Sequence, residues 1–411
     1  MVKIKIWIKD RYRQAVNSIA FYPAIIAISF LLISFLSISF DFSEQGKQFK
    51  SQLHLLRLRD ASTARSIISS IAAGIISLTV FSFSMVMIVL NQTASQMSNR
   101  ILDKLIGSRF HQVVLGVYVG TIVYALFLLS SIRDIDSGIR IPALSTYLLI
   151  LITILDVFLF IYFLHYITQS VKYEVIIRRI FKETKLQLEH KCCLSEEPSA
   201  SPLIENASVI YSEASGIYEN FEKHSLLDIC HENDCTLQIL PAPGTFILKG
   251  LPIVNSDKRL PRDVMSKIND SVNIRVTESV EENFFYGFRQ LSEVAIKALS
   301  PGINDPGTAI ECMRALFKLY AHRLCHFPDN VIKNEKYKTR IIINELSFED
   351  IFETTLLPIW DYGKNDRMIQ HEIRHLLTML FSLNQNTSVE QLLHEVELKI
   401  LKENKSNKNI L

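Results

Sequence analysis

Four long apolar segments occupy the first 170 residues of the chain, at about 20–40, 66–90, 113–132 and 142–168. Each is long enough to cross the roughly 30 Å hydrocarbon core of a bilayer as a helix, which takes about 20 residues. The first segment is too long for the core of a signal peptide, and no A-x-A cleavage pattern follows it. The pattern predicts a bundle of four transmembrane helices, with the first retained as an anchor.

The rest of the chain mixes short apolar and polar stretches, as soluble domains do. Strand-like segments separated by Pro and Gly turns fill residues 206–260, and longer helical patterns follow them. We expect a mainly α protein, in which a four-helix transmembrane bundle precedes an α+β cytosolic domain with a small β-barrel-like element and a C-terminal helical part. The predicted boundaries are a membrane domain at 1–185, a linker at 186–205, a β-rich subdomain at 206–260 and a helical domain at 261–411.

Positive charge is unequal on the two sides of the predicted bundle. Lysine and arginine near the ends of spans stay preferentially on the cytosolic side of a membrane. One side carries thirteen of them, in the N-terminal flank, the second loop and the tail after the fourth span, and the other side carries six. The asymmetry predicts a multi-pass protein with both termini in the cytosol.

Composition narrows the set of partners. The net charge is only +2, and no stripe rich in Lys and Arg is present, which argues against a nucleic-acid partner. All six cysteines follow the fourth span, so in the cytosol we expect free thiols. The sequence indicates no cofactor, and the expected partners are the lipid bilayer and further copies of the same chain.

The second apolar segment carries a polar stripe. A serine, threonine or asparagine recurs every seven residues, at Thr63, Ser70, Ser77, Ser84, Asn91 and Ser98. Such a repeat keeps one face of a helix in register with a neighbour, and small polar residues allow close approach and interhelical hydrogen bonds. Two interpretations stay open: a packing seam inside the bundle or between subunits, and a water-filled path lined by hydroxyl groups.

Asp156, near the middle of the fourth segment, is the only acid inside the predicted spans. An ionised carboxylate in a bilayer is costly, so its side chain is expected to face protein or water. Ser77 and Tyr124 lie at a matching depth and are the expected partners. Asp156 is either a protonated group that donates a hydrogen bond to a neighbour or an ion or proton site.

A turn-forming motif, SPGINDP, stands at residues 300–306. Glycine permits a positive φ and proline stops or starts a helix, so the motif predicts a tight link between two helices. Asp305 is the expected N-cap of the second helix, with Pro306 in its first turn. The alternative is that the amides at the start of this helix bind an anion. The motif residues are Ser300, Pro301, Gly302, Asn304, Asp305 and Pro306.

Three stretches together resemble a known family: ALSPGINDPGTA at 298–309, FSFSMVMIVLNQTASQMSNRIL at 81–102 and LPAPGTFILKGLPIV at 240–254. The family comprises predicted membrane proteins of bacteria and is classed as a domain of unknown function. The resemblance covers most of residues 15–325. It implies a location in the bacterial inner (cytoplasmic) membrane and no established activity, so it carries over no catalytic residue.

Residues 371–375, HEIRH, match the zinc-protease motif H-E-x-x-H on a predicted helix. This spacing puts His371 and His375 on one face for zinc, with Glu372 as general base and Glu395 as a candidate third ligand. However, Arg374 stands where such proteases usually have an uncharged residue, and the motif lies outside the family-like region. We favour a surface helix that binds no metal.

These features leave three function classes. The polar stripe and Asp156 favour a homo-oligomeric channel or transporter with a polar seam on its second span. The large soluble part instead suits a membrane-anchored sensor or scaffold whose cytosolic domain binds a partner. A membrane metalloprotease is the least favoured class. No sequence feature identifies an enzymatic activity, a transported ion or a bound ligand.

Overall fold

The computed structural model describes residues 20–45, 48, 60–96, 109–132, 141–170, 172–196, 204, 207–275, 283–333 and 338–408. The chain forms two compact units, residues 1–172 and 173–411, and each is described by itself. Several sequence predictions fall outside the described residues: the basic residues of the N-terminal flank, of the first and third loops and at positions 100 and 104, the serine at position 98, and linker residues 197–203.

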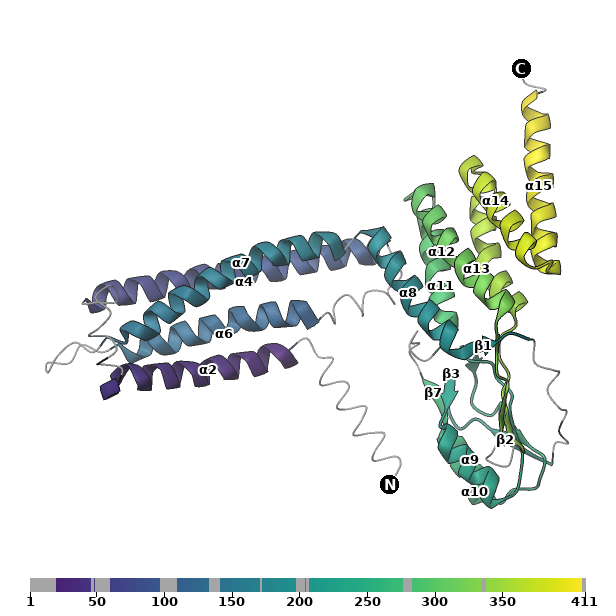
Figure 1. The fold of residues 1–411 in the computed structure, drawn as a ribbon, viewed down its shortest axis with the longest axis horizontal. Helices are drawn as coiled ribbons and strands as arrows, with labels where there is room; N and C mark the ends of the chain where they lie inside the picture. The colour runs from purple at the N-terminus through teal and green to yellow at the C-terminus, as the bar shows by residue number, and fades with distance from the viewer. Residues whose placement is uncertain are drawn as a thin grey trace. The chain divides into compact units, whose positions relative to one another are not determined.

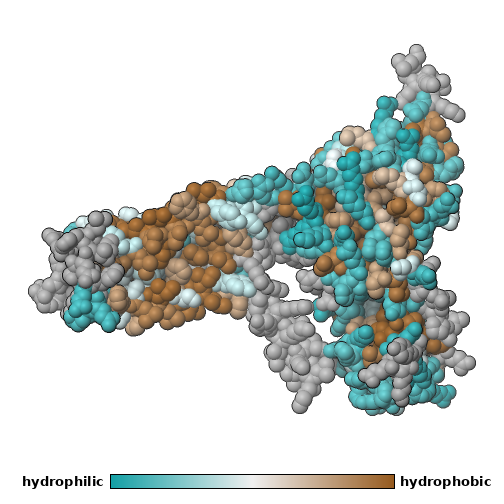
Figure 2. Space-filling view, in the orientation of Figure 1, coloured by the Kyte–Doolittle hydropathy of each residue, from teal (hydrophilic) through white to brown (hydrophobic). Residues whose placement is uncertain are grey.

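Four apolar helices build the membrane unit, which confirms the predicted number of membrane-capable segments (Figure 1). Much of their surface in Figure 2 is hydrophobic, and side chains such as Leu36 and Phe158 are 65% exposed. An apolar surface of this extent is suited to lipid rather than water. The helices are α2 (Phe21–Phe42), α4 (Ala61–Gln96), α6 (Arg109–Ser131) and α7 (Ala143–Ser170).

Helix α6 is the best buried of the four and contacts the other three. Its glycines allow the closest approach, because a Cβ atom at Gly116 would lie 3.0 Å from the Cα of Pro23 in α2. A Cβ atom at Gly120 would lie 2.7 Å from the ring of Phe30 in the same helix. Small residues at helix contacts are a common way to pack spans tightly in lipid, so α6 forms the axis of this unit.

Open β-sheets, rather than a closed barrel, form the β-rich part of the soluble unit. In its described residues the largest sheet has the strand order β2-β6-β4-β10-β9, with β10 and β4 parallel and its other pairs antiparallel. The other sheets have the orders β5-β3-β7 and β1-β8. The strands are β1 (Cys192–Leu194), β2 (Ser208–Tyr211), β3 (Gly216–Phe221), β4 (Leu237–Ile239), β5 (Phe246–Ile247), β6 (Pro252–Ser256), β7 (Val272–Arg275), β8 (Phe327–Pro328), β9 (Val331–Lys333) and β10 (Thr339–Ile342).

Two glycines shape the turns on either side of β5. Gly244 and Gly250 have φ angles of +93° and +89°, a region in which other residues are strained. Helices α9 (Lys223–Glu232) and α10 (Arg262–Ser271) contribute Leu226 and Ile268 to the apolar core of this part. All six cysteines are free.

The helical part of the soluble unit surrounds an aromatic core. Tyr320 is fully buried, and its hydroxyl group lies 2.6 Å from that of Thr355. Trp360, in the same helix as Thr355, is also buried, and its Nε1 atom donates to Glu395 at 2.7 Å. The helices are α8 (Tyr173–Lys191), α11 (Phe285–Ala298), α12 (Pro306–Cys325), α13 (Phe348–Gly363), α14 (Arg367–Leu383) and α15 (Thr387–Lys408).

Helix caps follow the sequence with one exception. Ser347 and Asp350 form a reciprocal capping box at α13, as their spacing predicts. The sequence pattern also suggests Ser388 as the cap of the last helix, but Asn386 caps it instead. Helix α15 begins one residue earlier, and the Oδ1 atom of Asn386 accepts from the amides of Ser388 and Val389 at 3.0 and 3.3 Å.

Candidate functional site

Asp156 lies inside the membrane unit although its neighbours in α7 face outward. Leu155 and Val157 are 59% and 46% exposed, whereas Asp156 is fully buried. Within the described residues, its carboxylate oxygens make no hydrogen bond of ordinary geometry, although the hydroxyl group of Thr121 lies beside them. A buried acid with no partner is rare, because leaving a charged group dry and unpaired costs several kcal/mol.

Hydroxyl groups from α4 and α6 lie around this acid. Thr121 is next to Asp156, but its Oγ1 atom already donates to the carbonyl oxygen of Val117 at 3.0 Å. Tyr118 lies within electrostatic range of Asp156 and beside Ser82 of α4. The hydroxyl groups of Tyr118 and Ser82 are buried and lie beside each other, but neither makes a hydrogen bond of ordinary geometry among the described residues. We call Ser82, Tyr118, Thr121 and Asp156 the Asp156 pocket.

A second acid, Asp41, lies in the last turn of α2 and is also fully buried. The expectation that Asp156 is the only acid in the spans is therefore wrong, because α2 continues two residues past the predicted end. Unlike Asp156, Asp41 is well bonded: its Oδ2 atom accepts from the amide and the hydroxyl group of Ser145, at 2.8 and 2.9 Å. Its Oδ1 atom lies 3.4 Å from the amide of Leu144. Asp41 thus satisfies amides at the N-terminal end of α7, where a negative charge is favourable.

Buried polar side chains follow α6 between these two acids and beyond. Gln112, Tyr118, Thr121 and Tyr124 are each at most 2% exposed, and they span roughly 18 Å of helix at 1.5 Å per residue. Tyr124 does not contact Asp156 as the sequence analysis expected. Its hydroxyl group instead donates to the carbonyl oxygen of Ser145 at 3.1 Å and lies 2.9 Å from that of Ser37. Polar groups therefore extend along the axis of the bundle towards Asp41.

The polar stripe of α4 lies on the face opposite to the Asp156 pocket. Ser70, Ser77, Ser84 and Asn91 are exposed, and Ser77 donates to the carbonyl oxygen of Ala73 in its own helix at 3.0 Å. The structure does not bring Ser77 to Asp156. The buried face of α4 has its own seven-residue repeat, at Ala61, Ile68, Ile75 and Ser82. The two repeats are two residues apart, which is about 200° around a helix of 3.6 residues per turn.

The SPGINDP motif forms a link between α11 and α12. Asp305 caps α12: its Oδ1 atom accepts from the amide of Thr308 at 3.1 Å, and its Oδ2 atom accepts from the Thr308 hydroxyl group at 2.6 Å. Ser300 donates to the carbonyl oxygen of Lys297, and Asn304 has a positive φ of 49°. Because Asp305 already supplies a negative charge to this helix start, these contacts favour the structural interpretation over anion binding.

The HEIRH residues are engaged elsewhere or point outward. Glu372 accepts two hydrogen bonds from Arg314, at 2.7 and 3.2 Å, and Glu395 accepts from Trp360. His371 and His375 are exposed on α14. Among the described residues, no group of three His, Cys, Asp or Glu side chains is arranged to hold a metal ion. The residues of the motif are thus not assembled into the zinc site that the spacing suggested.

Charged groups of the soluble unit gather where α8 and α12 end. Arg323 is 4% exposed and donates to the carbonyl oxygen of Leu346 at 3.0 Å. Burial raises the pKa of Glu345, and Lys191, 3.9 Å away, and Arg323 oppose that shift. Burial also raises the pKa of Cys192 to about 11, so this thiol stays protonated and unreactive at neutral pH. The cluster links helices to strands and shows no feature of a reaction centre.

Comparison with known proteins gives a family but no activity. The family described as "Predicted membrane protein (DUF2254)" matches residues 16–379. The match extends past residue 325 and includes the HEIRH residues, so the expectation that this motif lies outside the family-like region is wrong. The chain is similar to uncharacterized protein Mb1321c of Mycobacterium bovis and to uncharacterized protein Rv1290c of Mycobacterium tuberculosis, each 22% identical over 340 residues. The match covers 79% of this chain and 64% of each relative, so the chain spans less than two thirds of their length. No solved structure matches the chain.

Proposed function

This chain belongs to the family of predicted membrane proteins DUF2254, and on that premise we propose that it is a channel or transporter for protons or a small monovalent cation. The proposed location is a bacterial inner membrane, with both termini in the cytosol. The observation that supports the proposal is the Asp156 pocket, where a buried carboxylate lies beside buried hydroxyl groups, and neither it nor the hydroxyl groups of Tyr118 and Ser82 make a hydrogen bond of ordinary geometry among the described residues.

The chemistry of the pocket favours a ligand with one positive charge. Asp156 is the only carboxylate of the pocket, whereas divalent cations are usually held by several carboxylate and carbonyl oxygens. A proton would neutralise Asp156 and turn it into a hydrogen-bond donor for Tyr118 or Ser82. Intramembrane acids that face the inside of a bundle commonly mark ion and proton pathways. The polar side chains along α6 extend such a pathway in both directions from the pocket.

We further propose that the protein is a homo-oligomer whose subunits meet at the polar stripe of α4. Ser84 lies at a hollow of about 610 Å³ between α2, α4 and α6, whose lining also includes Thr79, Phe83 and Leu115. Serine and threonine at such a position allow a helix of a second copy to approach closely. That helix can then accept hydrogen bonds from their hydroxyl groups. Ser77 and Asn91 extend the same exposed face.

Ion flux into liposomes tests the proposal. We expect reconstituted protein to carry protons, Na⁺ or K⁺ down a gradient, and Asp156→Asn to abolish or strongly reduce the flux, because the amide cannot be ionised. Leu155→Met, an exposed neighbour in α7, is the matched control and should leave the flux unchanged. Absence of flux for all three cations through the original protein would refute the proposal, as would undiminished flux through Asp156→Asn.

A membrane-anchored sensor or scaffold is the second candidate function. It requires a ligand or partner on the soluble unit, and a groove between α12 and α14 offers a place for one. Reconstituted protein that conducts none of the three cations would favour this alternative.

A further inference from the structure

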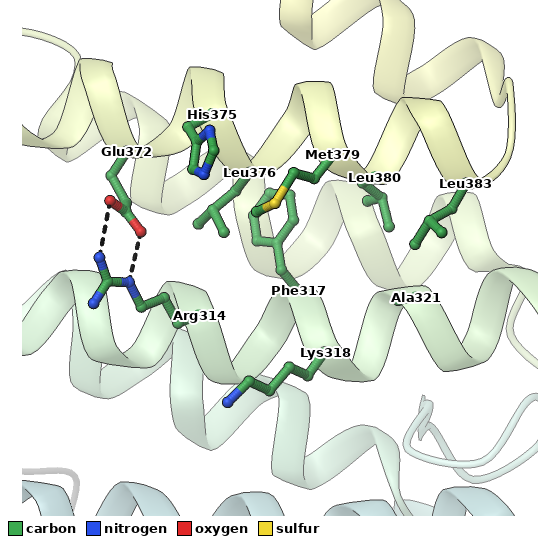
Figure 3. Close-up of a pocket in the computed structure, with 10 residues that line it drawn as sticks. All are labelled: Arg314, Phe317, Lys318, Ala321, Glu372, His375, Leu376, Met379, Leu380 and Leu383. Carbon is green, nitrogen blue, oxygen red and sulfur yellow. Dashed lines mark hydrogen bonds and ion pairs between the residues drawn. The ribbon is translucent and has the colours of Figure 1, made fainter.

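A groove of about 380 Å³ lies between α12 and α14 in the soluble unit (Figure 3). The two helices run in the same direction, since Arg314 pairs with Glu372, and further along both helices Asn384 reaches the carbonyl oxygen of Leu324. Helical spacing places one row of side chains from each helix along the groove. The row on α12 is Arg314, Phe317, Lys318 and Ala321, and the row on α14 is Glu372, His375, Leu376, Met379, Leu380 and Leu383.

The groove is amphipathic along its length. Phe317, Leu376 and Leu380 are buried in its floor, whereas Met379 and Leu383 line it with 45% and 63% of their surface exposed. In Figure 3 these apolar side chains occupy the part of the groove away from the Arg314–Glu372 pair. Exposed apolar side chains beside a buried apolar floor are a common feature of binding sites.

The polar end of the groove carries an excess of positive charge. The guanidinium group of Arg314 is neutralised by two hydrogen bonds from its nitrogens to Glu372. Lys318 has no such carboxylate among the described residues, and its Nζ atom lies 5.7 Å from the centre of the Phe181 ring. His375 is exposed on the opposite wall. In Figure 3 the side chain of Lys318 extends from α12 away from α14, so an anionic group would meet its ammonium at the rim of the groove and find no unpaired carboxylate among the lining residues.

We propose that this groove binds a free long-chain carboxylate, with the carboxylate at Lys318 and the chain along Phe317, Met379 and Leu383. The volume of the groove lies in the range of small-molecule sites. A stable protein interface, by contrast, buries about 800 Å² on each partner, so we favour a small-molecule ligand. A phospholipid carries two chains and a larger head group, so a single-chain ligand fits better. The inference is independent of the proposed ion transport.

The test uses the full chain in nanodiscs of phosphatidylcholine and titrates laurate by calorimetry, with empty nanodiscs as the blank. We expect saturable binding beyond the blank. Lys318→Glu should weaken it about tenfold, because an attraction becomes a repulsion, and Met379→Gln about threefold, because apolar contact area is lost. All substituted side chains are exposed, so the fold should be retained. Leu401→Gln, at a 56% exposed leucine on α15, is the matched control and should bind as the original does.

Several outcomes would overturn the proposal. Laurate heats equal to those of empty nanodiscs would show that no site exists. Equal affinity in all variants would place binding outside the groove, and equal affinity for dodecyltrimethylammonium would remove the role of Lys318. Binding of short-chain phosphatidylglycerol to the protein without any laurate binding would identify a membrane lipid, and binding of an acidic amphipathic peptide in place of laurate would identify a protein partner.

Discussion

The membrane unit contains two fully buried acids in opposite situations. Asp41 accepts hydrogen bonds from the amide and hydroxyl group of Ser145, whereas Asp156 has the hydroxyl group of Thr121 beside it but accepts no hydrogen bond of ordinary geometry within the described residues. Their positions in the helices explain the difference. Asp41 faces the start of α7, where the first amides have no partner inside the helix. Asp156 lies amid continuous helix, where backbone amides are already bonded and only side chains, water or a ligand can satisfy an acid.

The comparison separates an acid that stabilises the fold from an acid that is free to act. A buried carboxylate that accepts hydrogen bonds from a neighbouring helix, as Asp41 does from Ser145, holds two helices together. A buried carboxylate without donors changes the charge inside the bundle whenever it gains or loses a proton. Burial alone therefore does not identify a functional acid in a membrane, and the supply of donors is the more useful criterion.

The same substitution at both acids should have its largest effect at Asp41. Asp41→Asn places an amide group against donors of Ser145, so buried hydrogen bonds are lost, and we expect a loss of about 2 kcal/mol of stability. Asp156→Asn removes no hydrogen bond that the structure shows and should change stability by less than about 1 kcal/mol. Thermal unfolding of both variants in the same detergent measures the difference. Equal destabilisation would mean that Asp156 has a structural partner.

Leucine substitutions on the two faces of α4 should change the stability less than Asp41→Asn does. Ser82→Leu forces a larger side chain into the Asp156 pocket and should cost about 1–2 kcal/mol of stability. Ser77→Leu, on the exposed face, should leave unfolding of the single chain unchanged, but it should lower the oligomer size because bulk at a close-packed seam separates helices. Unfolding curves and light scattering report the two effects. A Ser77→Leu variant that unfolds earlier while keeping its oligomer size would reverse the assignment of the faces.

Tyr124→Phe should have the smallest effect. It deletes the hydroxyl group that donates to the carbonyl oxygen of Ser145, and interhelical hydrogen bonds of this kind average about 0.6 kcal/mol. Thermal unfolding should shift by that amount, with Asp41 still in place. A loss as large as that of Asp41→Asn would mean that Tyr124 and Asp41 act as one network rather than as independent contacts.

Much of the fold follows from local patterns that act within a few residues. Long apolar runs predict α2, α4, α6 and α7, and the capping residues Asp305 and Ser347 predict the starts of α12 and α13. Gly244 and Gly250 mark turns, and both stand at positions where the backbone has a positive φ. The open sheets depend on pairings across the chain, such as β4 with β10, for which local periodicity carries no signal.

The candidate site was only half predicted. Asp156 is conspicuous because it is an acid in an apolar segment, but its neighbours depend on which face of α4 packs inward. The hydroxyl repeat that includes Ser77 drew attention to the wrong side, since Ser82 belongs to a repeat that is otherwise Ala and Ile. Asp41 was missed because the apolar run ends at residue 40 and the helix does not. A repeat of small and β-branched residues, followed by one serine, is the signal that could have found Ser82.

The parallel pairing of β4 with β10 also affects how the protein is made. Ile341 of β10 lies opposite Leu237 of β4, so the largest sheet joins segments about 100 residues apart in the chain. Strand β4 keeps an unpaired edge until the ribosome has released residue 342, and exposed edges invite wrong pairing. All four spans have been synthesised long before that point. The four spans are therefore available for membrane insertion while the soluble unit is still incomplete, and a chain cut short after β7 would keep its four apolar helices but carry an unfinished sheet.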